Sequence, residues 1–235
     1  MKSIPVPIQL LPLQIGTIIA RQTSHMLASF KINNHPSADT TSNSPKINVK
    51  WPNDVLIDGN KIAGVLIESY MDHQNNIWLL VGIGVNVFYA PAVPLKGKHR
   101  GRQATCLKDV IMKYKNTYDD NGNHVCTDIN HENADIDNVD HENDHVLIYI
   151  KKAQLMASNL AQDLATWVTN TPTNITRDNN VIKDWKEWAE FGQELILRDE
   201  PGDEKVWTVD IQNDGQLRVK DKHGKERLLV ADYLL

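Results

Sequence analysis

The chain has 235 residues, is 41% hydrophobic and carries a formal net charge of −5, which suits one large domain or a medium domain with a small appendage. No apolar run approaches the ~18 residues of a membrane span, and the start of the chain, broken by three prolines, lacks the apolar core of a signal peptide. The two cysteines, Cys106 and Cys126, fit neither a disulfide framework nor a zinc site, so we expect a reducing, cytoplasmic setting. Because no membrane span is present in the pattern, we expect no membrane partner.

The N-terminal part of the chain predicts a packing helix and then an antiparallel meander. Apolar residues recur at helical spacing through residues 9–30, and Pro12 suits the first turn of that helix. Strand-like runs follow at residues 47–57, 61–67 and 77–87. The Asp58-Gly59 pair between the first two runs is a hairpin signal. Short connections favour antiparallel pairing, because a parallel pair needs a long crossover.

Residues 113–145 are rich in Asn, Asp and His and have few large apolar side chains, so they predict a disordered insert. Nine of the 30 acidic residues lie between Asp119 and Asp144, where there is no Lys or Arg. The rest of the chain therefore has 21 acidic residues against 25 basic ones. The histidines and Cys126 of the insert raise metal binding as an alternative, but their spacing matches no established metal site.

Two further helices are expected after the insert. Apolar residues recur at helical spacing through residues 146–168 and again through residues 178–191. Three large aromatic side chains lie on these stretches: Trp167, Trp185 and Trp188. Large aromatic residues at helical spacing indicate core positions, and we expect all three to be buried.

After Gly192 the pattern changes to short strands separated by turn sequences. Four or five such strands in this short stretch favour a small barrel appended to the main domain. We therefore predict a main domain at residues 1–191 and a small one at residues 192–235.

The stretch VKWPNDVLIDGNKIAGVLIE, residues 49–68, holds polar residues that a hairpin does not need. Asn53 and Asp54 could form an ordinary turn. The strand pattern resumes immediately after them, however, so we interpret Trp-Pro-Asn-Asp as a kink or bulge that directs side chains at a ligand. Gly64 would let a ligand approach the strand backbone closely.

Lys61 begins the second run of this stretch. Strict alternation places Lys61 on the face of Ala63 and Val65, and Gly64 on the other face. Both faces are largely apolar, so we expect both to be covered. An ammonium group beside a buried region needs an anionic partner, although Lys61 taken alone could also be an exposed hairpin residue.

The third run ends in Gly82-Ile83-Gly84-Val85-Asn86. A dinucleotide-binding fingerprint needs a third glycine where this chain has Val87, so we reject that interpretation. A glycine-lined strand end that presents the amide of Asn86 suits contact with a purine edge.

Three segments together closely resemble the catalytic domain of biotin protein ligases, the holocarboxylase synthetases. They are Lys50-Trp51-Pro52-Asn53-Asp54, the run from Lys61 to Glu68, and Gly82 to Asn86, with Ala104-Thr105-Cys106-Leu107 as a weaker fourth match. The resemblance implies an α+β fold of the biotin/lipoate ligase kind, with a mixed, largely antiparallel sheet and packing helices. The small domain after Gly192 is similar to the SH3-like barrel that follows the catalytic domain in this family.

The resemblance also implies a two-step reaction. The biotin carboxylate attacks the α-phosphate of ATP to give biotinyl-5′-AMP and pyrophosphate, and a lysine of a carboxylase carrier domain then attacks the mixed anhydride. ATP, Mg²⁺, biotin and the carrier domain are the implied cofactors and partners. No nucleic-acid partner is expected, because the chain has no basic stripe and no helix-turn-helix pattern.

The resemblance assigns roles to residues of this chain. Lys61 would be the catalytic residue, contacting the biotin carboxylate and the α-phosphate, and Asp54 would hold the metal ion. The biotin pocket would be lined by Lys61, Gly64, Val65 and Leu66. ATP and the adenylate would be bound by Lys50, Trp51, Asn53, Asp54, Asn86 and Thr105.

One family feature has no counterpart in the matching place. Family members carry a Gly-Arg-Gly-Arg loop upstream of this region, which folds over biotin and the adenylate. The Gly-Arg pair of His99-Arg100-Gly101-Arg102 lies downstream of Asn86 and is not that loop. We therefore expect a partial catalytic domain with little ligase activity in this chain alone. The alternatives are an inactive fragment, a regulatory protein that binds biotin or its adenylate, and a lipoate ligase, although the Trp-Pro-Asn-Asp block favours biotin.

Overall fold

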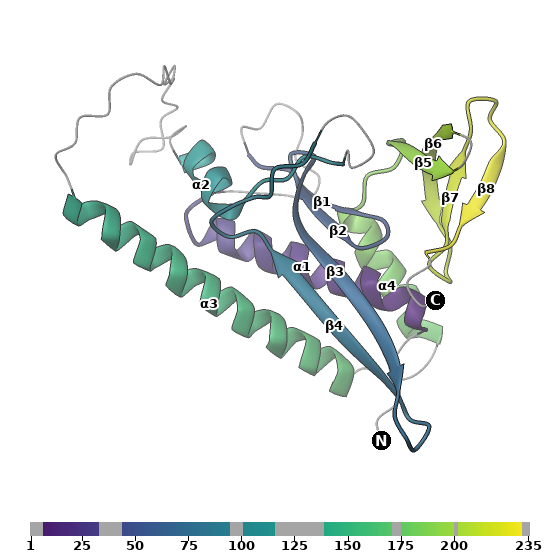
Figure 1. Ribbon diagram of the computed structural model, residues 1–235, viewed down its shortest axis with the longest axis horizontal. Coiled ribbons are helices and arrows are strands. Elements are labelled where there is room, and N and C mark those ends of the chain that lie inside the picture. Colours follow the sequence, from purple (N-terminus) through teal and green to yellow (C-terminus); the bar gives the residue numbers. More distant parts are fainter. Residues whose placement is uncertain are drawn as a thin grey trace.

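The computed structural model describes residues 7–32, 44–94, 101–115, 139–170, 175–199 and 202–231. These residues form two four-stranded sheets and four α-helices, which confirms the α+β class (Figure 1). Within the described ranges, no helix is long and apolar enough to cross a membrane.

The first predicted helix is confirmed and lies at the centre of the main unit. A short 3-10 turn, Ile8–Leu10, leads into α1, Leu11–Ala28, with proline in its first turn. Nearly all of α1 is buried, because α1 contacts the first sheet, α3 (Val139–Asn170) and α4 (Ile175–Trp188) (Figure 1). Burying each Leu or Ile side chain contributes about 1.5–3 kcal/mol, so packing stabilises α1 on most of its sides, where it also buries polar Gln14 and Gln22.

The first sheet is the predicted antiparallel meander, in the order β1-β2-β3-β4. Its strands are β1 (Ile47–Lys50), β2 (Asp54–Ile57), β3 (Asn60–Met71) and β4 (Ile77–Val85). The predicted single strand at 47–57 is wrong: residues 51–53 form a turn, and Lys50 pairs with Asp54 across it. Proline cannot donate a ladder hydrogen bond, and Asn and Asp are strong turn formers. Trp-Pro-Asn-Asp therefore reverses the chain and does not merely kink it.

A bulge in β3 changes which face Lys61 occupies. Val55 pairs with Ala63 and Leu56 with Lys61, so Ile62 is an extra residue in the ladder. An extra residue shifts the alternation by one position. Lys61 therefore lies on the face of Gly64, and the prediction that placed it with Ala63 is wrong.

The predicted helices are confirmed with shifted ends. Trp185 and Trp188 are buried, and Trp167 is partly buried against the same core. α2 (Leu107–Lys115) and α3 occupy the two ends of the predicted insert at 113–145. Residues 116–138 lie outside the described residues, as do the insert's Cys126 and two of its histidines. In the ranges that are described, no group of three His, Cys, Asp or Glu side chains could hold a metal ion.

The C-terminal strands are also confirmed. They are β5 (Glu194–Asp199), β6 (Gly202–Ile211), β7 (Leu217–Lys220) and β8 (Glu226–Leu229), paired antiparallel in chain order around buried Val206, Leu217 and Val219. Among the described residues the sheet is an open meander that does not close into a barrel. The SH3-like barrel and the boundary at Gly192 therefore stay predictions.

Candidate functional site

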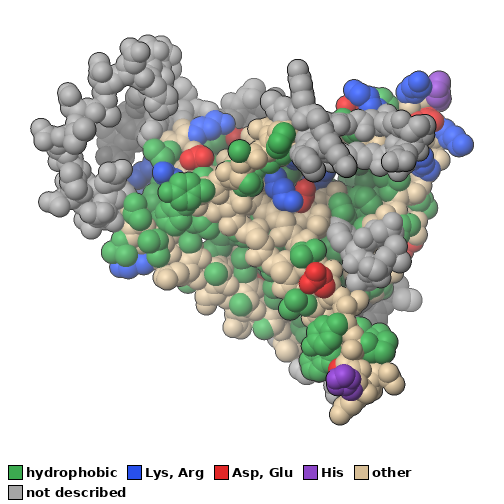
Figure 2. Space-filling view, in the orientation of Figure 1, with side chains coloured by type: hydrophobic (Ala, Val, Ile, Leu, Met, Phe, Trp, Pro, Cys, Tyr) green, Lys and Arg blue, Asp and Glu red, His purple; other side chains and the backbone are tan. Residues whose placement is uncertain are grey.

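An open cleft of about 430 Å³ lies along β3 and β4, at the face of the sheet turned away from α1. It is lined by Asn53, Lys61, Gly64, Val65, Leu66, Gly82, Ile83 and Gly84. The expectation that both faces of β3 are covered is wrong here, because Leu66 is 59% exposed while Val65 is buried. In Figure 2, which shows this side of the molecule, basic and acidic side chains adjoin near the middle, beside a broad area of backbone and small or polar side chains.

Glycine backbone forms the floor of the cleft. Gly64 pairs with Gly84, and Leu66 pairs with Gly82, so three glycines lie together on one face of the β3–β4 ladder. A Cβ added at Gly84 would meet nothing within 4 Å. Sequence reasoning treated Gly82 and Gly84 only as the lining of a strand end that presents Asn86 and named neither as a site residue, although glycine at alternate strand positions is a signal for close approach by a ligand.

Lys61 and Asp54 form an ion pair at the end of this floor. The Lys61 Nζ lies 2.5 Å from Asp54 Oδ1, and the two side chains are 41% and 16% exposed. The ammonium therefore has a fixed anionic partner and still faces solvent, where an incoming anion could reach it. A Cβ added at Gly64 would lie 3.0 Å from the Lys61 Nζ, so a side chain at this position would push the ammonium away from where it now lies across the strand.

Asn53 fastens the β1–β2 turn to β3. Its side-chain Nδ2 donates to the Val65 carbonyl at 2.6 Å, and its own carbonyl accepts from the Val65 N–H at 3.0 Å. Asp54 follows directly, opposite Gly64 in the register. This double link holds the carboxylate of Asp54 beside the cleft.

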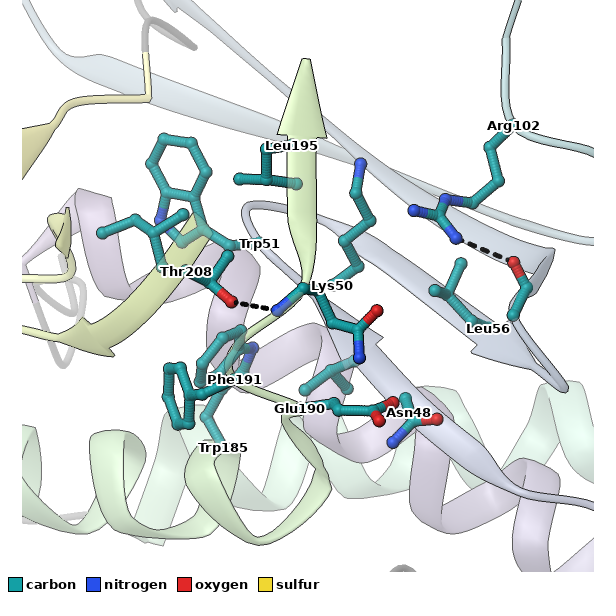
Figure 3. Close-up of a pocket in the computed structure, with 14 residues that line it drawn as sticks. Asn48, Lys50, Trp51, Leu56, Arg102, Trp185, Glu190, Phe191, Leu195 and Thr208 are labelled. Carbon is teal, nitrogen blue, oxygen red and sulfur yellow. Dashed lines mark hydrogen bonds between the residues drawn. The ribbon is translucent and has the colours of Figure 1, made fainter. Parts of the chain in front are cut away.

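Two residues predicted to bind ATP, Lys50 and Trp51, line a different cavity. This cavity, of about 70 Å³, lies between the first sheet, the end of α4 and the C-terminal sheet (Figure 3). The Trp51 Nε1 donates to the carbonyl of Gly215, in the β6–β7 turn, at 3.0 Å. The structure thus brings Asn53, Asp54 and Lys61 together and turns Trp51 toward the second sheet.

Asn86 and Thr105 lie beside Lys61 without lining the cleft. The side chain of Asn86 donates to the Thr105 carbonyl at 3.0 Å, and the N–H of Thr105 donates to the Lys61 carbonyl at 2.9 Å. Ala104 forms a parallel bridge with Lys61. These bonds close the end of the β3–β4 pair and fix the backbone on both sides of the lysine.

The turn that precedes Lys61 is held by side chains from α2 and its neighbours. Asp58 accepts hydrogen bonds from Tyr114 Oη at 2.6 Å and from Lys113 Nζ and the Lys46 N–H, each at 3.0 Å. Partial burial of its side chain raises the pKa of Asp58, but hydrogen bonds from Tyr114, Lys46 and Lys113 outweigh this effect and hold the pKa below its ordinary value. Arg102 also donates to the Gly59 carbonyl at 2.9 Å. Sequence reasoning missed this support, because the partners lie far apart in the chain.

The part of the chain that contains the cleft matches a known protein family. Residues 4–86 match the model of the Biotin/lipoate A/B protein ligase family, and this span contains the whole lining of the cleft. The resemblance to biotin protein ligases that the motifs indicated is therefore confirmed for this part of the chain.

Two curated relatives match over short stretches. The chain is 48% identical over 46 residues to a biotin–[acetyl-CoA-carboxylase] ligase of Paracoccus denitrificans, covering 20% of this chain and 19% of the relative. It is 42% identical over 43 residues to the bifunctional ligase/repressor BirA of Bacillus subtilis, covering 18% and 13%. The matched stretches thus span less than a fifth of either relative.

A solved structure extends the likeness in fold to most of the chain. The apo structure of biotin protein ligase from Aquifex aeolicus aligns with a TM-score of 0.50 at 18% identity, covering 96% of this chain and 73% of that one. At this level of identity the alignment shows a shared fold.

Proposed function

We propose that the cleft binds biotin and ATP and joins them as biotinyl-5′-AMP, and that the biotinyl group then passes to a lysine of a carboxylase carrier domain. The observation that carries this proposal is the Lys61–Asp54 ion pair at the end of a glycine floor, within the part of the chain that matches the ligase family. We place the reaction in the cytoplasm, a setting that suits the free, buried thiol of Cys106.

The first step brings two anions together, so it needs a fixed cation. An oxygen of the biotin carboxylate attacks the α-phosphorus, and the bond from that phosphorus to the pyrophosphate oxygen breaks. The ammonium of Lys61 offsets the repulsion between carboxylate and phosphate and contributes most where charge accumulates in the transition state. Asp54 keeps the ammonium at the cleft when no ligand is bound.

The remaining cleft residues supply space and contacts. The bare backbone at Gly64 and the side chains of Val65 and Leu66 would receive the fused rings of biotin. Asn86, whose N–H group is directed at Thr105, would offer its side-chain oxygen to the amino group of adenine. Lys50, Trp51, Asn53 and Thr105 stay proposed adenylate contacts, with the first two reached only by a ligand that extends toward the second sheet.

The carboxylate of Asp54 is the kind of ligand that Mg²⁺ prefers. Asp54 presents a carboxylate beside the cleft, and Mg²⁺ in proteins is commonly held by one or two carboxylates together with substrate phosphates. Asp54 would hold the ion in this way, and the ion would offset part of the charge of the phosphates.

In the second step, the amine of the carrier lysine attacks the acyl carbon of the anhydride. The bond from that carbon to the AMP oxygen breaks, AMP leaves, and the proton of the amine is released to solvent. The product is an amide between biotin and the carrier domain.

Biotin-dependent release of pyrophosphate from Mg-ATP tests the proposal. In a version of the chain supplied with the family's upstream Gly-Arg-Gly-Arg loop, we expect Lys61→Ala to lower this rate about 100-fold, since loss of one transition-state donor costs about 3 kcal/mol. Lys222→Ala changes an exposed lysine of the β7–β8 turn and is the matched control. Equal, measurable rates in Lys61→Ala and in the loop-bearing chain without that change would contradict the role of Lys61.

The low activity expected for this chain alone stays a prediction. A carrier-biotinylation assay on the 235-residue chain tests it, and normal rates would contradict it. The same assay with lipoate in place of biotin distinguishes a lipoate ligase. Biotin binding with no pyrophosphate release would instead indicate a regulatory binding protein.

A further inference from the structure

The β6–β7 turn of the C-terminal sheet is wedged between two parts of the main unit. Gly215 lies in this turn with a φ of +85°, and its carbonyl accepts the indole N–H of Trp51 at 3.0 Å. A Cβ added at Gly215 would lie 3.0 Å from Leu10 Cδ2 and 3.2 Å from the Gln9 carbonyl. The turn therefore contacts both Trp51 and the 3-10 turn that precedes α1, and a side chain at Gly215 would fit only if these neighbours moved by a few tenths of an ångström.

Trp51 belongs to the packing of both sheets. Its ring contacts the main hydrophobic core and also the small core of Val206, Leu217 and Val219. Figure 3 shows the ring beside Thr208 and Leu195, across the small cavity from the first sheet. An indole with a bonded N–H and two packed sides has little freedom to rotate.

The turn that holds Trp51 also carries cleft residues. Asn53 and Asp54 follow Trp51 by two and three positions, and Asp54 pairs with Lys61 at 2.5 Å. Displacement of Trp51 would therefore move the turn that positions Asp54 and, through it, the ammonium of Lys61. An error of about 1 Å in such positioning can cost about 100-fold in rate.

Other contacts hold the C-terminal sheet in place independently of Trp51. Ile211 is 2% exposed within the main core, and Lys186 Nζ on α4 lies 2.7 Å from Asp210 Oδ1 on β6. Loss of the Trp51–Gly215 bond should thus loosen the β1–β2 turn without releasing the sheet.

We infer that the Trp51–Gly215 bond is a latch through which the C-terminal sheet positions the cleft. Trp51 is in this respect a positioning residue, and the C-terminal sheet is a working part of the cleft and not a separate binding module. The structural arm of its test needs no ligand; only the activity arm rests on the proposed function.

The structural part of the test compares two glycines that both have a positive φ. Gly215→Ala disturbs the latch, whereas Gly224→Ala imposes similar strain at a φ of +82° in the β7–β8 turn, where an added Cβ meets nothing within 4 Å. The reporters are the ¹H–¹⁵N resonances of the Trp51 indole, the Asn53 side-chain amide and the Gly64 backbone amide, in the full chain without ligand.

We expect Gly215→Ala to shift all three resonances and Gly224→Ala to leave them in place. Trp51→Phe keeps an aromatic ring and removes the donor, so it should shift the Asn53 and Gly64 resonances in the same direction; it also decides the matter if Gly215→Ala does not fold. The inference is overturned if Asn53 and Gly64 stay unshifted in Trp51→Phe, or if both glycine variants have equal effects.

The activity arm separates chemistry from binding. We expect Gly215→Ala and Trp51→Phe to lower the rate of adenylate formation about tenfold while the affinity for biotin changes less than about twofold, because a misplaced cation affects the transition state most. Unchanged rates together with shifted resonances would overturn the inference. Absence of biotin binding in the unaltered chain would contradict the proposed function, while the resonances would still decide whether the latch exists.

Discussion

At the scale of single residues, Lys61 is positioned by a carboxylate and by a missing side chain. Asp54 gives the ammonium a partner, and Gly64 leaves the space through which the lysine reaches it. Asp54 and Gly64 lie opposite each other in the register, and Lys61 shares their face only because Ile62 is an extra residue in β3. The type of residue and the local register therefore act together to expose one cation at the cleft.

Gly64→Ala tests the part played by this space. The added Cβ would displace the end of the Lys61 side chain, which is flexible, so we expect the free energy of unfolding to change by less than about 1 kcal/mol. The rate of adenylate formation should fall about 10–100-fold, as for a cation misplaced by about 1 Å. Gly84→Ala is the control, because its Cβ would lie on the same floor with nothing within 4 Å. Equal losses in both variants would attribute the effect to lost space and not to Lys61.

The lowered pKa of Asp58 predicts that part of the free energy of unfolding depends on pH in the acid range. Its pKa is lower in the folded state than the ordinary 3.8, so the unfolded chain binds its proton first as the pH falls. The stabilisation is fully present well above pH 3.8 and is lost as the pH falls through the folded-state pKa. The stability difference between the unaltered chain and Asp58→Asn should therefore be constant from pH 5 to pH 7 and shrink below pH 3.8, by urea unfolding. A difference that grows on acidification would contradict this assignment.

At the scale of elements, the sequence supports some predictions and not others for identifiable reasons. Helical spacing of apolar residues predicted the ends of α1 and α4 to within a few residues, because the residues that a helix buries recur every three or four positions in the sequence. The turn at residues 51–53 was misinterpreted, since alternation cannot tell a kinked strand from a tight hairpin. The bulge at Ile62 depends on the partner strand, and no pattern within β3 itself reveals it.

The sequence predicted the motif residues of the candidate site but not their contacts with distant parts of the chain. Lys61, Gly64 and Asn53 belong to recognisable motifs, and all three line the same cleft. The direction of Trp51 was not predictable, because it depends on Gly215, which lies 164 positions away in the chain. Contacts between distant segments are set by packing, which the local sequence does not encode.

Asn53→Ala tests how firmly the β1–β2 turn is attached to β3. The change leaves the Val65 carbonyl without its side-chain donor, and an unmet polar group of this kind costs about 1–3 kcal/mol. Urea unfolding should show that loss, whereas Asn180→Ala, at an exposed position of α4, should change stability by less than about 0.5 kcal/mol. A loss below about 0.5 kcal/mol in Asn53→Ala would mean that the turn is held by other contacts.

At the scale of the whole molecule, the two sheets share their packing. Ile211 of the second sheet lies in the main core, Trp51 of the first contacts both cores, and Lys186 pairs with Asp210 between α4 and β6. Such shared contacts favour unfolding of the described part of the chain as one cooperative unit.

Calorimetry tests this cooperativity. We expect one transition with equal calorimetric and van't Hoff enthalpies for the unaltered chain, and a broadened or divided transition for Trp51→Ala, which removes the shared ring. Phe30→Ala removes a partly buried ring from the main core alone and should lower the transition temperature without dividing it. Two separate transitions in the unaltered chain would contradict the shared packing.

The role of Lys61 at a cleft for biotin and ATP is tested most directly by calorimetric titration with a non-hydrolysable analogue of biotinyl-5′-AMP, which carries both halves of the proposed ligand. We expect saturable binding to the unaltered chain and to Lys222→Ala, and an affinity lower by about 10–100-fold in Lys61→Ala, since a charged hydrogen bond contributes about 1.5–3 kcal/mol. Absence of binding to the unaltered chain, or equal affinity in Lys61→Ala, would contradict the proposal.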